Sequence, residues 1–445
     1  MAPHALQRAL GRAALSTAPA GSEIVSVAVL GTSVSLATQG GGSYSAMLRG
    51  AGEHYTASVQ RHVEQVLAPA LVGMRVDDQA AVDAALAAAS GGGANRAELA
   101  ARLGVSTAAC RAGADTRGLR LWEHIADTAG VAVGSRVVLP VPCVPAIAGR
   151  PAGATNKLPV RSAMFVPSGL DSFSDAAAAL SLAQAQLEAV VASEYGEAAQ
   201  TLRVGAGGVL APPVQSIAEA LDLCQAATRK AGLQAEQMPF AVDAAASHFF
   251  VGEQNAYNLD LASAEDAEPL EAQEDRGMLM SWYLRAREWD LNAEVMRGEE
   301  LLIVYKQLAD KYPIVSFEEP FDASDLEMWS KFSNAVGTLG VQVITPAQEF
   351  GKFAEWGAAS TLLIDLADSG TVTDVLDVWR STQAETWGAM FLSEGAADTF
   401  VDDLVVGVGA GMIKSVGPRQ SFSRLLQIED ECGDRKVFAG ALRDA

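Results

Sequence analysis

The chain has 445 residues, of which 49% are hydrophobic and 19% charged, a balance typical of a folded globular protein. A chain of this length exceeds one small core, so two domains are expected. The formal net charge of −22 argues against nucleic-acid binding, and no Lys/Arg cluster marks a basic patch. No apolar run approaches the roughly 20 residues that cross a bilayer, so no membrane span is expected.

The cysteines and the N-terminus bear on the cellular compartment. The first twenty residues carry Arg8 and Arg12 and no acid, a composition that organellar transit peptides share. The cysteines are widely spaced, with no C-x-x-C pair, and are expected to be buried free thiols in a reducing compartment. They are Cys110, Cys143, Cys224 and Cys432.

The first part of the chain, residues 1–136, is expected to form an α+β domain with strands first and helices after. Residues 22–36 alternate as a half-buried strand of an antiparallel sheet does. The glycines of Gln39–Ser43 predict a loop, either a functional lid or only a turn. A helical region is predicted from about Tyr55 to Ala89, and another runs through Leu121–Ala129.

From Val137 to the end, residues 137–445, short apolar strands alternate with helices, which is typical of a (β/α) barrel. The helix Ser174–Tyr195 has a Ser/Asp start and Gly196 as its C-cap. The expected fold class is therefore α/β, with a small N-terminal α+β domain before a TIM-like (β/α)8 barrel. The predicted strands are Val137–Val144, Pro239–Ser247, Tyr312–Phe321, Val341–Gln348, Ser360–Asp368 and Trp387–Ser393.

The stretch Tyr312–Phe321, YPIVSFEEPF, combines a buried strand with two acids at its C-terminal end. Pro320 stops the strand. In a barrel of parallel strands, Glu318 and Glu319 would point into the active-site mouth and hold a cation. The alternative is a strand that ends in solvated acids before a turn.

An acidic segment interrupts the barrel pattern at about residues 262–298. It begins with a run of acids and continues with Met278, Trp282, Arg285 and Trp289 at helical spacing. One interpretation is a surface helix packed on its own barrel. The other is a docking element, because Trp, Met and Arg are enriched at interface hot spots.

Several separate motifs, in order along nearly the whole chain from about His4, resemble enolase, which dehydrates 2-phosphoglycerate in glycolysis. They are PVPCVPAIAG (140–149), ATNKL (154–158), the VG…GG…LAP pattern of Val204–Pro212, AVDAAAS (241–247), VSFEEPF (315–321), DTFVDDLVVG (398–407), GMIKS (411–415) and GDRKVFAG (433–440). The resemblance implies a cap domain before the barrel and, usually, a homodimer. It also favours the first residues as the start of the fold over a transit peptide.

The resemblance implies a metal site that this chain carries only in part. Enolases hold a first Mg²⁺ ion with three carboxylates at the ends of barrel strands. Asp243 and Glu318 match two of these positions, but Pro346 and Ala347 stand where the third ligand is expected, and neither can bind a metal. Lys414 matches a retained substrate-binding lysine. We expect Asp243 and Glu318 to pair with Lys414 as a structural ion cluster; a weak Mg²⁺ site is the alternative.

The positions that the resemblance assigns to catalysis are also changed. The base, a lysine in the family, is Asp365 here, and the acid, a glutamate, is Gly207. Elsewhere Gly153 replaces a substrate-facing histidine, Ser162 another glutamate, and Gly40 the serine of the mobile loop, while the phosphate-binding loop after Leu392 is shortened. A lost base alone typically costs ~10²–10⁴-fold, and lost metal stabilisation of an enolate costs several kcal/mol more.

Other polar groups have simpler interpretations. Asp365 and Asp368 could form a relocated metal site or a new acid/base pair, but such acids more often face solvent. His124 and His248 are expected to be packed or surface residues, because no carboxylate or cysteine nearby in sequence suggests metal ligation.

The sequence therefore predicts an enolase-like pseudoenzyme with a structural or assembly role and no cofactor. Its partners would be proteins, as a homodimer or as a subunit of a larger cytoskeletal, axonemal or organellar complex. A cytoplasmic location, or a cytoskeletal or ciliary one, is expected in preference to a mitochondrial one. The alternatives are a genuine Mg²⁺-dependent phosphopyruvate hydratase, another enzyme that uses Asp365 as a base, or a regulatory subunit that pairs with an active enolase.

Overall fold

The computed structural model describes residues 21–49, 56–91, 95–132, 134, 136–205, 207–259, 295–393, 398–418 and 422–440. The chain forms two compact units, Met1–Thr128 with Ala367–Asp374, and Ala129–Leu366 with Val375–Ala445. Most of the predicted docking element at residues 262–298, including its tryptophans, lies outside the described residues. So do residues 394–397, where the shortened loop after Leu392 was predicted.

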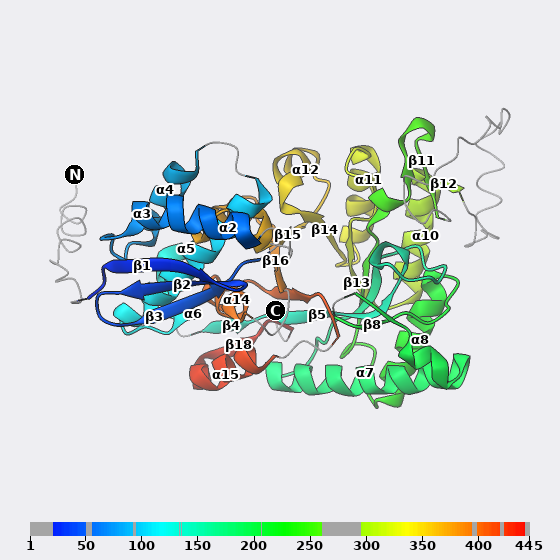
Figure 1. The fold of residues 1–445 in the computed structure, drawn as a ribbon. Helices are drawn as coiled ribbons and strands as arrows, with labels where there is room; N and C mark the ends of the chain where they lie inside the picture. The colour runs from blue at the N-terminus through cyan, green and yellow to red at the C-terminus, as the bar shows by residue number, and fades with distance from the viewer. Residues whose placement is uncertain are drawn as a thin grey trace, which may run out of the picture. The chain divides into compact units, whose positions relative to one another are not determined.

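The first unit is a three-stranded antiparallel sheet that packs against helices (Figure 1). The sheet contains β1 (Ile24–Leu30), β2 (Ser33–Thr38) and β3 (Ser43–Met47). The single strand predicted over residues 22–36 is instead a hairpin, because Gly31 adopts a φ of 62° and turns the chain. The sheet and the helices share one buried cluster that includes Val34 and Leu36.

The helices of this unit follow the sheet along the chain. They are α2 (Thr56–His62), a π-helical turn at Val63–Leu67, α3 (Ala68–Leu71), α4 (Gln79–Ser90), α5 (Arg96–Thr116) and α6 (Leu121–Ala129). The predicted helical region from Tyr55 to Ala89 is thus divided into several pieces. At the start of α5, Asn95 and Glu98 form a reciprocal capping box, which satisfies backbone N–H groups that the helix leaves free.

The second unit contains a closed barrel of eight strands, in which β17 pairs with β5. Strand β6 runs antiparallel to both of its neighbours, whereas the other neighbouring pairs are parallel. The predicted TIM-like barrel is thus observed with one reversed strand: no crossover helix separates β5 from β6, so the chain reverses directly. The strands are β5 (Val141–Ala148), β6 (Ser162–Phe165), β9 (Phe240–Asp243), β13 (Ile314–Glu318), β14 (Gln342–Pro346), β15 (Thr361–Ile364), β16 (Gly388–Ser393) and β17 (Met412–Ser415).

Shorter strands accompany the barrel. Strand β4 (Val137–Leu139) pairs with β18 (Lys436–Phe438), and β7 (Arg203–Val204) forms a hairpin with β8 (Val209–Leu210). A small antiparallel sheet contains β10 (Phe250–Val251), β11 (Ala256–Asn258) and β12 (Val295–Arg297).

Helices follow most of the barrel strands, and Figure 1 shows α10, α11 and α12 side by side. The longest helix of the described residues, α7, is capped by Ser172 and ends at Gly196, as predicted. By length and composition α7 could cross a membrane, and about a third of its apolar window is buried, with Leu180 and Leu187 in the barrel's outer core. The helices are α7 (Phe173–Tyr195), α8 (Ile217–Lys230), α10 (Gly298–Lys311), α11 (Leu326–Gly337), α12 (Phe350–Trp356), α13 (Val372–Ala384), α14 (Phe400–Gly407) and α15 (Ser423–Cys432).

Strand alternation decides which side chains enter the barrel. The ring of Phe317 lies 5.2 Å from Tyr305 of α10 and 5.2 Å from Phe332 of α11, so Phe317 faces the helices. Its neighbours Ser316 and Glu318 therefore face the barrel interior. Ile344, Met390 and Met412 of the barrel strands form a small apolar cluster, and Leu363 packs against it.

Candidate functional site

Two carboxylates meet at the C-terminal ends of neighbouring barrel strands. Asp243 is the last residue of β9 and Glu318 the last residue of β13, and the parallel ladder pairs these two residues directly. Both are buried, with 0% and 3% of their surface exposed. Glu318, which the sequence placed at a barrel mouth, is therefore buried beside Asp243, whereas the side chain of Glu319 is 23% exposed.

Lys414 of β17 lies between these two carboxylates. Its Nζ atom donates to Asp243 Oδ2 at 2.7 Å and to both carboxylate oxygens of Glu318 at 2.6 Å. The lysine side chain is only 7% exposed. The ion cluster predicted for Asp243, Glu318 and Lys414 is thus confirmed as a set of contacts.

A second cation, Arg161, also belongs to the site and was missed by the sequence analysis. Its Nη1 atom lies 3.4 and 3.3 Å from the two carboxylate oxygens of Asp243, and its Nη2 lies 3.8 Å from Glu319 Oε2. The sequence signal for Arg161 was its position next to Ser162, a predicted site position. Ser162 pairs with Asp243 in the barrel sheet. We define these five residues, Arg161, Asp243, Glu318, Glu319 and Lys414, as the mouth cluster.

Charges within the mouth cluster shift the pKa of each member. Burial disfavours ionisation of Asp243, but Lys414 and Arg161 outweigh this effect and hold its pKa below the usual value. Burial and then the charge of Asp243 raise the pKa of Glu318 to about 7, although Lys414 opposes them. Burial works against the charged form of Lys414, yet Asp243 and Glu318 raise its pKa above normal. The ammonium is therefore charged throughout the physiological range.

The backbone at these strand ends adopts an unusual conformation. Ala245 and Glu319 both have a φ of 46°, in the left-handed region. The Ala246 N–H donates to the Glu319 carbonyl at 3.0 Å, and the Ala244 N–H to the Glu318 carbonyl at 2.9 Å. These bonds hold the two strand ends together and stabilise the strained residues.

The end of the next strand, β14, supplies no further acid. Its last residues are Thr345 and Pro346, and the Thr345 hydroxyl is buried without a hydrogen-bond partner. Mg²⁺ requires a near-octahedral set of oxygen ligands. Within the described ranges, no group of three or more His, Cys, Asp or Glu side chains could hold a metal ion. The carboxylates of Asp243 and Glu318 already accept hydrogen bonds from Lys414.

The positions expected for the catalytic base and acid, Asp365 and Gly207, are not members of the mouth cluster. Asp365 directly follows the last residue of β15 and is half-buried. Gly207 lies between β7 and β8, where a Cβ would approach Gly417 Cα to 2.4 Å and the Val416 carbonyl oxygen to 2.9 Å. No acidic side chain fits at Gly207 unless this backbone moves.

The remaining predicted positions are dispersed. Gly153 adopts a φ of 88°, and a Cβ there would meet nothing within 4 Å. Ser162 is buried beside Asp243 in the barrel. In the other unit, Gly40 lies in the turn between β2 and β3, and its N–H donates to the Gly21 carbonyl at 2.9 Å.

The histidines and cysteines take the simple roles that were predicted for them. His124 is buried. His248, after β9, is largely exposed, and partial desolvation of its ring, followed by the nearby charge of Arg161, lowers the pKa of His248. All four cysteines are buried thiols outside any disulfide. Burial raises the pKa of Cys143, next to Lys414 in the strand register, to about 12, which disfavours the thiolate form that a nucleophile needs.

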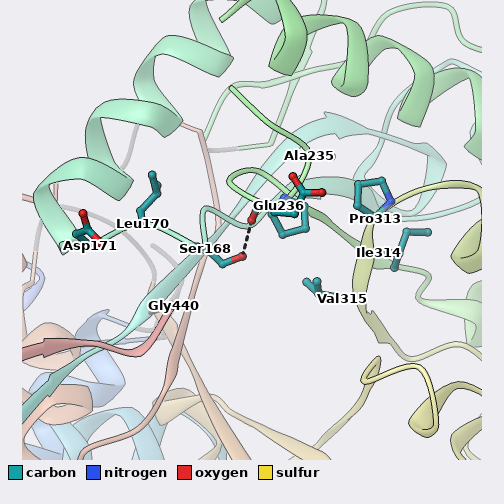
Figure 2. A pocket seen from close by; sticks show the side chains of 11 residues that line it. Ser168, Leu170, Asp171, Ala235, Glu236, Pro313, Ile314, Val315 and Gly440 are labelled. Carbon is teal, nitrogen blue, oxygen red and sulfur yellow. Dashed lines mark hydrogen bonds between the residues drawn. The ribbon is translucent and has the colours of Figure 1, made fainter. Parts of the chain in front are cut away.

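A pocket of about 470 Å³ lies at the opposite end of the barrel strands. Figure 2 shows Pro313, Ile314 and Val315 on one side, where β13 begins, and Ser168 beside Glu236 on the other. The Ser168 hydroxyl donates to the Glu236 carbonyl at 3.4 Å. None of the five mouth-cluster residues lines this pocket.

An α+β unit, an eight-stranded barrel with one reversed strand, and strand-end acids at the mouth define a class of two-domain barrel proteins. The family comparison identifies the class further. The model described as "Enolase, N-terminal domain" matches residues 21–125, and "Enolase, C-terminal TIM barrel domain" matches residues 136–285 and 281–444. The chain belongs to the enolase family, as its motifs indicated.

Proposed function

We propose that this enolase-family chain does not dehydrate 2-phosphoglycerate and serves instead as a structural or assembly subunit. The observation that carries the proposal is the position of Lys414. Its ammonium lies at hydrogen-bond distance from Asp243 and Glu318, the two acids that the family resemblance assigns to the metal. The lysine therefore uses oxygens that a catalytic Mg²⁺ would need.

The residues present do not fit a magnesium ion. A dication at Asp243 and Glu318 would have to displace Lys414 or lie beside its positive charge. The end of β14 offers Pro346 in place of a third carboxylate. Hard cations such as Mg²⁺ depend on several oxygen ligands, so two shared carboxylates support at most weak binding.

The proton-transfer groups that dehydration needs are also missing. Asp365 presents a carboxylate where a lysine base is expected, so it cannot use an ammonium form to contact an anionic substrate. Gly207 has no side chain, and Gly417 occupies the space next to it. Loss of a general acid or base typically costs ~10²–10⁴-fold. Both losses together would reduce turnover to background.

A coupled assay with 2-phosphoglycerate and excess Mg²⁺ tests the proposal, with an active enolase as the positive control. We expect no turnover above the protein-free rate. The variant Lys414→Ala serves as a background control, because trace contamination by a host enolase would survive this substitution. Turnover at even a thousandth of the ordinary enolase rate that is lost in Lys414→Ala would overturn the proposal and favour a genuine hydratase.

The assembly role rests on the retained fold. The barrel keeps a continuous outer core and a closed sheet, although the positions assigned to catalysis have changed. Light scattering of the purified chain would distinguish a homodimer from a monomer. Cross-linking mass spectrometry on the native assembly would identify its partners, and recovery of an intact enolase chain would favour a regulatory subunit instead.

A further inference from the structure

We propose that the ammonium of Lys414 acts as a built-in cation that holds the strand ends of the barrel mouth together in place of a divalent metal. The inference rests on the proposed function in one respect, the absence of a catalytic metal. It adds a structural role for this one side chain and predicts a ligand, a small primary amine, for the barrel that lacks it.

The hydrogen-bond geometry matches a primary ammonium. A lysine ammonium has three N–H donors and no acceptor. Three carboxylate oxygens lie within reach of Lys414 Nζ, namely Asp243 Oδ2 at 2.7 Å and both Glu318 oxygens at 2.6 Å. Every donor thus has a charged acceptor, which is the condition under which a buried ion pair is stable.

The contacts join strands that are far apart in the sequence. Lys414 is 171 positions from Asp243 and 96 positions from Glu318. The ammonium therefore bridges β17 to the pair β9 and β13 across the barrel, because β17 adjoins β5 and β16 in the sheet order and not β9 or β13. A metal ion at a barrel mouth would make the same kind of bridge.

The surroundings make the buried carboxylates costly to leave without the lysine. Met412, two residues before Lys414, belongs to the apolar cluster with Ile344 and Met390, so the ammonium has an apolar layer next to it. Arg161 adds a second positive charge at Asp243. With both cations present, three carboxylates still face only two positive charges, so removal of the ammonium would leave a larger excess of negative charge at the mouth.

Removal of the lysine tests the inference. Lys414→Ala lacks the three carbons and the nitrogen of propylammonium, and leaves Asp243 and Glu318 buried without their cation. We expect its melting temperature to fall by about 5–10 °C, since breaking one side of a buried ion pair is strongly destabilising. Millimolar propylammonium should restore a part of this loss saturably, whereas N,N,N-trimethylpropylammonium, which has no N–H donor, should not.

Two matched controls accompany this variant. Lys331→Ala removes a lysine whose ion pairs with Glu327 and Glu299 are about half exposed, and should change the melting temperature by less than about 1 °C. The triple variant Lys414→Met with Asp243→Asn and Glu318→Gln removes every charge of the bridge. It should melt within a few degrees of the natural protein and ignore the amine. It also keeps the test decisive if Lys414→Ala fails to fold.

Melting temperatures measured with and without a divalent metal can contradict the inference. The natural protein should show the same melting temperature in EDTA and in millimolar Mg²⁺. A saturable Mg²⁺-dependent rise that Asp243→Asn abolishes would overturn the inference, because a metal would then occupy the acids that Lys414 bridges. Lys414→Ala with an unchanged melting temperature, or a triple variant as unstable as Lys414→Ala, would overturn it as well. Since none of these measurements uses substrate, they fail or succeed separately from the activity assay.

Discussion

Gly207 and Gly417 pack backbone against backbone, so that a Cβ atom on either residue would lie 2.4 Å from the Cα atom of the other. Gly207 belongs to the connection between β7 and β8, and Gly417 follows β17, which carries Lys414. The contact closes the space in which the enolase resemblance places the catalytic acid. It requires glycine on both sides.

Restoring an acidic side chain at Gly207 should therefore destabilise the protein and not restore activity. Gly207→Glu and Gly207→Ala should each lower the free energy of unfolding by about 1–3 kcal/mol, because the neighbour is backbone and cannot rotate away. Denaturant unfolding measures the change. Gly411→Ala is the matched control, since a Cβ there meets nothing within 4 Å. A stable Gly207→Glu protein with measurable turnover would contradict the closed geometry.

Stability should depend on pH through Glu318. Burial, and then the charge of Asp243, raise the pKa of Glu318 from 4.5 to about 7. The folded state thus binds this proton more tightly than the unfolded state, so the contribution of Glu318 is fully present below pH 4.5 and is lost as the pH rises through 7. Its size is about 1–3 kcal/mol.

Urea unfolding at pH 5.5 and pH 8 measures this contribution. The natural protein should be more stable at pH 5.5 than at pH 8 by an amount that includes the contribution of Glu318. In Glu318→Gln this difference between the two pH values should be smaller by about 1–3 kcal/mol. Glu327→Gln, at a 70% exposed side chain, is the control and should leave the difference between the two pH values unchanged. An identical pH dependence in Glu318→Gln and the natural protein would show that Glu318 does not titrate there.

His124 should act in the opposite direction. Burial and then the charge of Arg117 lower its pKa from 6.5 to about 4. Because the folded state favours the neutral ring, the stability that His124 contributes is present above pH 6.5 and is lost as the pH falls to 4. His124→Gln should remove about 2–3 kcal/mol of this acid sensitivity. Arg117→Gln should remove part of it, and acid titrations followed by circular dichroism that coincide for all three proteins would refute the assignment.

Asp83 should anchor the segment Ala367–Asp374 to the helices of its unit. Its carboxylate accepts hydrogen bonds from the Thr373 N–H at 2.9 Å and hydroxyl at 2.7 Å, and from the Ser106 hydroxyl at 2.6 Å. Asp83→Ala leaves these donors buried and unpaired, at a cost of about 2–4 kcal/mol. Asp83→Asn should cost less, because an amide oxygen still accepts and burial already disfavours the charge.

Hydrogen exchange at the backbone amides of Val372 and Thr373 reports on this anchor. Both amides should exchange faster in Asp83→Ala than in the natural protein, because Thr373 donates to Asp83 and Val372 to Ser106. Amides within β9 are the internal reference. Unchanged exchange at both positions would mean that the segment is held by other contacts.

Local sequence patterns predicted the bounds of a helix or strand well where a capping residue or a proline ends it. The helix predicted at Ser174–Tyr195 is observed at Phe173–Tyr195, because Ser172 caps its start and Gly196 ends it. The strand within Tyr312–Phe321 is observed at Ile314–Glu318, before Pro320. The prediction of one strand over residues 22–36 was wrong, because Gly31 turns a chain whose alternation continues on both sides of it.

The motifs in the sequence determined the enolase family, the barrel and the positions at which the site residues of the family are changed. They placed Asp243 and Glu318 at strand ends, because the point at which a strand ends depends on the residues next to it in the sequence. The tertiary structure alone decided that Arg161 joins the cluster, that Gly417 fills the space beside Gly207, and that three oxygens surround the Lys414 ammonium. These contacts join residues that are 82, 210 and 171 positions apart. They depend on strand register and on barrel closure, which no local periodicity specifies.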